Sequence, residues 1–154
     1  MNTALPLIAF FKDIDKGDIP LVGGKGANLG EMTKAGFPVP NGFAITVPAY
    51  EMFIQENNFN KNILDILKTL DVNDPEQLNQ ASKNIKKLII NGKYPDIVSK
   101  EIIKAYKKLS GRFKSALVAV RSSATAEDLP GASFAGQQET FLNIKGEANL
   151  LVKV

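Results

Sequence analysis

The sequence predicts an α+β fold in which helices pack against a small mixed or antiparallel sheet. Three short segments, near 43–46, 117–120 and 138–144, are apolar and rich in β-branched or aromatic residues, as strands are. The stretch from about 48 to 110 instead repeats apolar residues at helical spacing. Strands and helices do not alternate regularly, so we do not expect a doubly wound parallel sheet.

Length and composition are those of one ordinary globular domain. The chain has 154 residues, of which 44% are hydrophobic and 8% aromatic. It holds no apolar run long enough to span a membrane, and residues 1–11 lack the basic start and the cleavage site of a signal peptide. We therefore expect a cytoplasmic protein without a membrane partner.

Two missing residue types narrow the possible chemistry. The sequence contains no Cys and no His. This excludes disulfides, thiolate nucleophiles and Cys/His metal sites. It also excludes a His general base, a Ser-His-Asp triad and a phosphohistidine on this chain. Chemistry performed by these residues alone must use Lys, Arg, carboxylates, hydroxyls or the backbone.

The first elements lead into a glycine-rich turn. Residues 6–11 fit an edge strand, and residues 13–20 are polar and turn-rich. Three glycines surround Lys25 and precede a helix over 27–35, which Gly36 ends. Such a turn is a ready anion site, because N–H groups and the helix dipole favour negative charge there.

The glycine-rich turn matches neither of the common phosphate-binding motifs. Gly26 follows Lys25 where a Walker A motif needs Ser or Thr, and the glycine spacing is one residue too long for G-x-G-x-x-G. A tight turn with a solvated Lys25 is therefore the alternative that spacing alone favours. The helix that follows is expected to bury Leu29 and Met32 on one face.

Four amphipathic helices are expected between about 48 and 110. The first begins at Pro48, a residue favoured at the first helical position, and runs to about Gln55. Apolar residues at helical spacing mark the inward faces of all four: Ala49, Met52 and Phe53; Ile63, Ile66, Leu67 and Leu70; Leu78, Ala81, Ile85, Leu88 and Ile89; Val98, Ile102, Ala105, Tyr106 and Leu109. The break at 91–95 predicts that the last two form a helical hairpin.

Basic residues concentrate on this predicted hairpin. Residues 83–114 carry ten basic and two acidic side chains, within a net charge of +3. Four lysines share the face opposite the apolar stripe of the last helix: Lys100, Lys104, Lys107 and Lys108. A solvated face explains them best, because nucleic-acid binding would prefer Arg and interleaved exposed aromatics. A basic nucleic-acid-binding module is the distant alternative.

The stretch 118–141 is organised around one arginine. Arg121 ends the segment 117–120 and precedes small residues that include Ser122, Gly131, Ser133 and Gly136. The other basic positions of the chain are Lys, apart from Arg112, so an Arg here indicates fixed geometry. Its planar fork of donors, beside glycines without a Cβ, suits close approach to a phosphate. The alternative is that Arg121 pairs with Glu127 or Asp128 to fix a surface loop.

Three motifs in the same order resemble the phosphoenolpyruvate synthase (pyruvate, water dikinase) family. They are Val22-Gly-Gly-Lys-Gly-Ala-Asn-Leu-Gly-Glu-Met32, Val39-Pro-Asn-Gly-Phe43 and the segment 118–143. The match covers nearly the whole chain, at the family's N-terminus. The amino-acid sequence of 120–130 and 133–138 is more similar to that of the synthase than to that of pyruvate, phosphate dikinase. Rifampicin phosphotransferases share much of this sequence and are the close alternative.

The resemblance implies that residues 1–154 are the N-terminal portion of an ATP-grasp nucleotide-binding domain, with a helical insertion at about 48–110. In the family, the Lys of Gly-Gly-Lys-Gly and the Arg of Val-Arg-Ser contact ATP phosphates, and a glycine-bearing loop covers the nucleotide. The nucleotide-binding residues that this implies here are Lys25, Arg121, Ser122, Gly131, Ser133, Phe134 and Gly136.

The implied reaction converts ATP, pyruvate and water into AMP, phosphoenolpyruvate and phosphate through a phosphohistidine. The resemblance places that His, the Mg²⁺-binding carboxylates, the second ATP-grasp half and the pyruvate-binding barrel downstream. The apolar helix start at 150–154 also stops within two turns, so we expect a piece of a longer protein that is inactive alone. ATP is then its ligand, and the remaining enzyme domains are its partners.

Lys25 and Arg121 are predicted to converge on one phosphate-sized spot, although they are far apart in the sequence. Each follows a β-like segment and is surrounded by small residues. We expect their charged heads to lie within about 10 Å, a span that one phosphate group bridges with hydrogen bonds on both sides.

Overall fold

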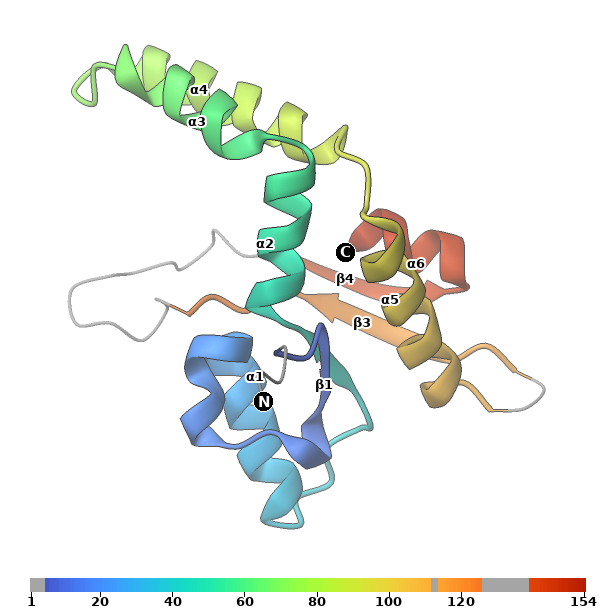
Figure 1. Ribbon diagram of the computed structural model, residues 1–154. Coiled ribbons are helices and arrows are strands. Elements are labelled where there is room, and N and C mark those ends of the chain that lie inside the picture. The colour runs from blue at the N-terminus through green and yellow to red at the C-terminus, as the bar shows by residue number, and fades with distance from the viewer. Residues whose placement is uncertain (1–4, 112–113, 126–138) are drawn as a thin grey trace.

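The computed structural model describes residues 5–111, 114–125 and 139–154 (Figure 1). Its helices and strands, in chain order, are β1 (Ile8–Phe10), α1 (Ile19–Lys34), β2 (Phe43–Ile45), α2 (Val47–Glu56), α3 (Phe59–Lys68), α4 (Pro75–Ile90), α5 (Asp96–Leu109), β3 (Leu117–Arg121), β4 (Thr140–Lys145) and α6 (Glu147–Lys153). Two short 3₁₀ turns join β1 to α1. The predicted combination of helices with small antiparallel sheet structure is confirmed.

The described strands form two separate antiparallel pairs rather than one sheet. β1 pairs with β2, and β3 pairs with β4, where Arg121 lies opposite Thr140. The register of the second pair shifts so that Leu142 and Asn143 together face Ala119, which is a β-bulge. Asn143 has a φ of 59°, a left-handed value that Asn tolerates better than most residues. The bulge bends the ladder that ends at Arg121.

Helix α5 is the centre of the main core. Five buried residues form this core, and both strand pairs pack partly buried side chains against it: Ala49, Val98, Ile102, Tyr106 and Leu150. Tyr106 is 1% exposed. Its hydroxyl donates to the carbonyl of Ala116 and accepts from the N–H of Gly146 at 2.9 Å. One buried tyrosine thus fastens α5 to both strands of the β3–β4 ladder at one end, where Leu117 pairs with Lys145.

A second, smaller core lies between α1 and the other face of the β1–β2 pair. Ile14, Val22 and Ala27 are buried there, and Ala9 and Ala44 pack against them. The expectation that Leu29 and Met32 form the buried face of α1 is wrong in part. Leu29 is half-buried and Met32 is 43% exposed. The helix instead buries small residues, which allow a close approach to the chain before it.

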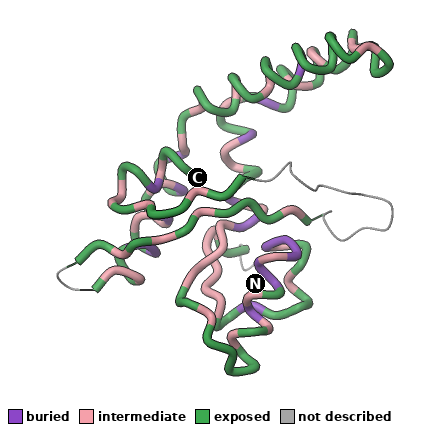
Figure 2. The backbone as a smooth tube through the Cα atoms, turned by 180° about the vertical axis from the view of Figure 1, so that it is seen from behind, coloured by how far each residue is buried: buried purple, intermediate pink, exposed green. Residues whose placement is uncertain are grey.

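Helices α3 and α4 form an arm that projects from the body of the molecule (Figure 1). They lie side by side, whereas α5 returns to the body, so the predicted hairpin between the last two helices is wrong. Asn91–Pro95 does break the chain there, but it redirects α5 toward the core. Most of the arm is exposed (Figure 2), and the buried residues of its two helices are Phe59 and Ala81.

The base of the arm is a compact joint. The side chain of Asn57 accepts from the N–H of Lys93 at 2.9 Å and donates to the carbonyl of the same residue at 2.9 Å. Phe53 packs against Phe59 and Tyr94 with ring centroids 5.6 Å and 5.4 Å apart. The chain therefore enters and leaves the arm at one place, which these contacts hold together.

Candidate functional site

Helix α1 contains a kink at the glycine-rich turn. Residues Ile19–Val22 make a first helical turn, and Pro20 lies in that turn. The expectation of a β-like segment before Lys25 is therefore wrong. Gly23 then has φ 73° and ψ 169°, far from helical values, and the helix resumes at Gly24. The predicted glycine-rich turn into a helix is thus present. It lies within α1 rather than before it.

Two residues that follow β3, Ser123 and Ala124, cap the part of α1 that resumes at Gly24. The N–H of Gly24 donates to the carbonyl of Ala124 at 3.2 Å, and the N–H of Gly26 donates to Ser123 Oγ at 3.2 Å. Ser123 Oγ in turn donates to the carbonyl of Val22 at 2.9 Å. We call this contact, between Val22–Gly26 and Ser123–Ala124, the seam. It joins two segments that lie about 100 residues apart in the chain.

The seam requires a glycine at position 23. A Cβ on Gly23 would lie 2.4 Å from Ser123 Oγ and within 3.0 Å of backbone carbons of Ser123 and Ala124. Gly23 also occupies the position where a helix usually has a Ser, Thr, Asp or Asn whose side chain caps the first N–H groups. Gly23 has no such side chain, and Ser123 supplies the missing oxygen from the other segment.

Arg121 lies at the surface, at the last position of β3. Its neighbour Ser122 is also exposed, and the N–H of Ser122 lies 3.5 Å from the carbonyl of Glu139 on the adjacent segment. No ion pair joins Arg121 to another residue of the described part of the chain. The alternative partners, Glu127 and Asp128, lie outside the described residues.

Lys25 lies inside the seam, between the two glycines whose N–H groups bond to Ser123 and Ala124. Its side chain is half-buried. The backbone on which Lys25 sits is therefore fixed to the residues that directly follow Arg121. The distance between the two charged heads remains a prediction.

The anion site expected at the glycine-rich turn needs correction. Two of its N–H groups, on Gly24 and Gly26, already donate within the chain. A phosphate near this turn would therefore not meet these two N–H groups, and positive charge from side chains becomes its main attraction. Of the predicted nucleotide-binding residues, Lys25, Arg121 and Ser122 are described. Gly131, Ser133, Phe134 and Gly136 lie outside the described residues.

Sequence reasoning missed Ser123 and Gly23 as residues that build the site. Their roles depend on a contact between distant segments, which no local pattern reveals. One local signal was available: the second helix of α1 starts at a glycine with no capping side chain. A missing cap suggests that the first N–H groups have partners elsewhere in the chain.

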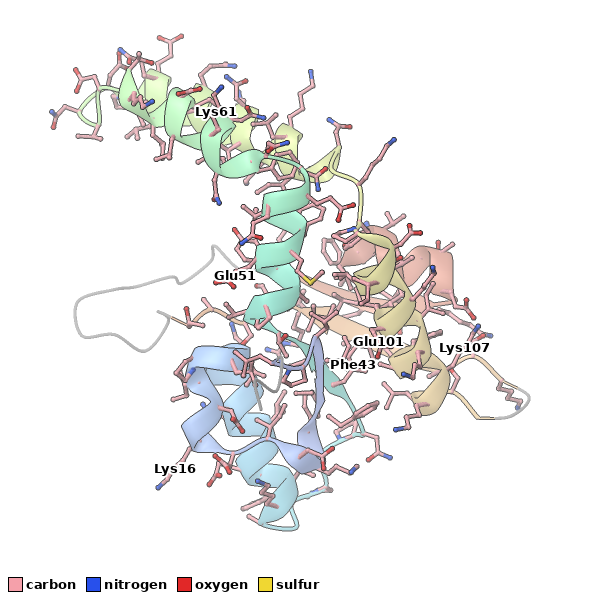
Figure 3. All side chains as sticks on the ribbon, in the orientation of Figure 1. Lys16, Phe43, Glu51, Lys61, Glu101 and Lys107 are labelled. Atoms are coloured by element: carbon pink, nitrogen blue, oxygen red, sulfur yellow. The ribbon has the colours of Figure 1, made fainter. Side chains whose placement is uncertain are left out.

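The lysines of α5 are solvated and paired, as the solvated-face interpretation predicts. Lys104 lies 3.1 Å from Glu101, and Lys107 lies 3.3 Å from Glu147 of α6 (Figure 3). Lys100 approaches Asp96 at 3.7 Å, and the ammonium of Lys108 lies 5.0 Å from the ring centroid of Phe10. These partners reduce the field that a phosphate backbone would meet.

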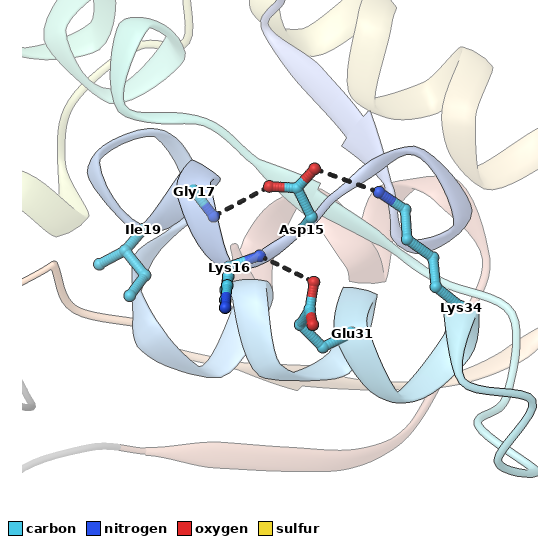
Figure 4. Close-up of a pocket in the computed structure, with 6 residues that line it drawn as sticks. All are labelled: Asp15, Lys16, Gly17, Ile19, Glu31 and Lys34. Carbon is cyan, nitrogen blue, oxygen red and sulfur yellow. Dashed lines mark hydrogen bonds and ion pairs between the residues drawn. The ribbon is translucent and has the colours of Figure 1, made fainter.

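A groove of about 800 Å³ lies between α1 and the chain that precedes it, and Asp15, Lys16, Gly17, Ile19, Glu31 and Lys34 line it (Figure 4). Asp15 accepts from the N–H of Gly17 at 2.9 Å and pairs with Lys34 at 3.3 Å. These contacts hold the pKa of the Asp15 carboxyl below its ordinary value, the Gly17 N–H most of all. Glu31 accepts from the N–H of Lys16. Three charged groups of the groove, Asp15, Glu31 and Lys34, thus hold the chain before α1 in place.

Residues 5–111, 114–125 and 139–154 offer neither a membrane span nor a cluster of metal ligands. None of the helices there is long and apolar enough to cross a membrane. Within the same ranges, no group of three or more His, Cys, Asp or Glu side chains is placed to hold a metal ion.

Comparison with known proteins gives the chain its relatives. It is 47% identical to a probable phosphoenolpyruvate synthase of Methanothermobacter thermautotrophicus, over 94% of this chain and 21% of the relative. It is 42% identical to the phosphoenolpyruvate synthase of Pyrococcus furiosus, over 98% and 23%. It is 45% identical to the phosphoenolpyruvate synthase of Helicobacter pylori, over 94% of this chain and 18% of the relative. The chain thus spans about a fifth of the length of these relatives.

These identities confirm the resemblance to phosphoenolpyruvate synthases. The family model described as the pyruvate phosphate dikinase AMP/ATP-binding domain matches residues 19–154, which include both sides of the seam. Membership of an AMP/ATP-binding family supports ATP as the ligand. The chain belongs to the family of the pyruvate phosphate dikinase AMP/ATP-binding domain.

Proposed function

We propose that this chain is the first part of the nucleotide-binding domain of a phosphoenolpyruvate synthase, with an ATP-grasp fold. Its helical insertion is the segment from about 48 to 110. Lys25 and Arg121 contact the ATP phosphates in this proposal, assisted by Ser122. The loop that contains Gly131, Ser133, Phe134 and Gly136 covers the nucleotide.

One observation carries the proposal: the seam ties the turn around Lys25 to the end of the strand that carries Arg121. Three hydrogen bonds of 2.9–3.2 Å join these segments. The two cations that the family places on ATP phosphates thus stand on a shared support. Phosphoryl transfer depends mainly on positioning and on neutralising charge, and a shared support serves both.

The residues present fit a triphosphate. Arg121 is exposed at a strand end and has no ion pair in the described chain, so its fork of donors is available to phosphate oxygens. The Ser122 hydroxyl beside it can donate a further hydrogen bond. Bound ATP supplies the phosphoryl group, and the residues of this chain bind it, orient it and offset its charge.

The remaining parts of the reaction lie outside these 154 residues in this proposal. A phosphohistidine cannot form on a chain without His, so another domain provides it. Mg²⁺ ligands, the second half of the nucleotide clamp and the pyruvate site also come from domains that follow. The enzyme then converts ATP, pyruvate and water into AMP, phosphoenolpyruvate and phosphate in the cytoplasm.

The test compares two conservative substitutions in the full-length enzyme. Arg121→Lys keeps the charge but loses the bidentate fork, so kcat/KM for ATP should fall by about 100-fold or more. Lys25→Arg replaces a point charge by a larger cation and should cost about tenfold. Lys61→Arg, on the exposed arm (Figure 3), serves as the matched control and should leave kcat/KM unchanged.

Two results would contradict the proposal. One is activity of Arg121→Lys within about threefold of the wild type, since a phosphate contact cannot be that tolerant. The other is pyruvate-dependent formation of phosphoenolpyruvate that needs inorganic phosphate as a substrate rather than releasing it. That second outcome would assign the enzyme to the phosphate-dependent dikinases.

A further inference from the structure

We propose that Ser123 is a positioning residue for nucleotide phosphates: its hydroxyl fixes the Lys25 turn to the Arg121 strand end. This inference rests on the proposed function and adds to it a residue outside the predicted phosphate contacts. Ser123 touches no phosphate in this proposal. It acts through the backbone on which the two cations stand.

The Ser123 hydroxyl bonds to backbone groups on both sides of the kink at Gly23. Ser123 Oγ donates to the carbonyl of Val22 at 2.9 Å and accepts from the N–H of Gly26 at 3.2 Å. A hydroxyl is the smallest side-chain group that can donate and accept at once. The two backbone groups flank Lys25 and Gly24, so one hydroxyl bridges both sides of the kink at Gly23.

The helix that resumes after Gly23 receives its cap from outside the helix. A helix leaves its first N–H groups without partners inside the helix, and a capping side chain normally satisfies one of them. Here Gly23 provides no side chain, and Ser123 takes the capping role for Gly26. Ala124 satisfies Gly24 through its carbonyl. Loss of the Ser123 hydroxyl removes two of the three hydrogen bonds of the seam and leaves the bond from Gly24 to Ala124.

Both predicted phosphate-binding cations lie within two residues of a seam residue in the sequence. Ser123 follows Arg121 by two residues, and Gly26 follows Lys25 directly. A shift of either backbone at the seam therefore moves a phosphate-binding cation within two residues. Hydrogen bonds from a charged group to phosphate are among the stronger ones, so losing one when the seam loosens should weaken phosphate binding about 10- to 100-fold.

The test measures nucleotide binding to the full-length enzyme without pyruvate. Two probes are titrated calorimetrically: AMP, and an ATP analogue with a non-hydrolysable imido bridge between its β and γ phosphates. Ser123→Ala should weaken the analogue about 10- to 100-fold and leave AMP within about twofold. Ser123→Thr keeps the hydroxyl and should restore the analogue's affinity. Ser99→Ala removes a hydroxyl that bonds locally in α5 and should change neither.

A merely structural role would give a different pattern. If Ser123→Ala weakens AMP and the analogue equally, or weakens neither, the positioning role is overturned while ATP binding by the family's residues stands. If the wild type binds neither probe, the proposed function fails as well. If Ser123→Ala does not fold, Ser123→Thr decides, and a tenfold selective loss of the analogue in that variant would refute the dependence on the hydroxyl.

Discussion

Replacing Gly23 by Ala should be among the most damaging single-methyl changes in this chain. Gly23 adopts φ 73° and ψ 169°, a region that is essentially restricted to glycine, and Ala there costs about 1–3 kcal/mol. The new Cβ would also lie 2.4 Å from Ser123 Oγ. The segment Ser123–Ala124 must then move away and weaken the three hydrogen bonds of the seam, each worth about 1 kcal/mol. If all three bonds are lost, these terms together give about 4–6 kcal/mol.

A matched glycine separates strain from crowding. Gly36 also has a positive φ, 80°, but a Cβ there would meet nothing within 4 Å. Gly36→Ala should therefore show backbone strain alone, about 1–2 kcal/mol. Urea denaturation followed by circular dichroism gives the free energy of unfolding of each variant. If Gly23→Ala and Gly36→Ala agree within about 1 kcal/mol, the seam contributes little and the reasoning fails.

Three further predictions follow from other parts of the molecule. Tyr106→Phe leaves the carbonyl of Ala116 and the N–H of Gly146 without their partner, so unfolding free energy should fall by about 2 kcal/mol in urea denaturation; a change below about 0.5 kcal/mol would contradict this. The N–H groups that Asp74 accepts, that of Gln77 first, lower the pKa of its carboxyl below 3.8. Because the folded pKa is depressed, the carboxylate stabilises the fold above the unfolded pKa, and this contribution is lost as pH falls through the folded pKa. Asp74→Asn should therefore flatten the loss of stability below about pH 4, and an unchanged profile from acid titration of the two proteins would count against it. For the paired lysines of α5 we expect weak duplex DNA binding that falls by about 0.9 log units per log unit of salt for each phosphate neutralised; micromolar or tighter sequence-selective binding at physiological salt would contradict the solvated-face interpretation.

Local patterns predicted the elements of the fold well. Pro48 marks the start of α2 to within one residue, since the helix begins at Val47, and the apolar periodicity locates α3, α4 and α5. The strand at 117–120 also appears, one residue longer, because β-branched residues in a short run are a strong strand signal. These features depend on neighbours in the sequence, so the sequence alone reveals them.

Pairing between distant elements was harder to predict. The break at 91–95 was taken for a hairpin turn, but the same residues direct α5 into the core, where Ile102 is completely buried. Nothing local distinguishes these outcomes, because both helices carry an apolar stripe. The division of the strands into two pairs likewise depends on where α5 packs, not on strand composition.

The candidate site likewise contains residues that the sequence reveals and one that only the structure reveals. Lys25 and Arg121 were identified by residue type and by resemblance, because their chemistry is visible in the sequence. Ser123 was not, because its hydroxyl matters only once β3 lies beside α1. Long-range capping of this kind has no sequence spacing, and the structure is needed to find it.

The joint formed by Asn57 and Lys93 has a consequence for how the chain can change in length. Entry and exit of the arm are held at one place, so the residues between them close a loop whose ends are already fixed. Changing the length of such a loop costs little, since closure entropy grows slowly with loop size. Deletions or added helical turns beyond Phe59 and before Gly92 should therefore leave the body's thermal midpoint nearly unchanged in differential scanning calorimetry. A large drop would instead show that the arm supports the body.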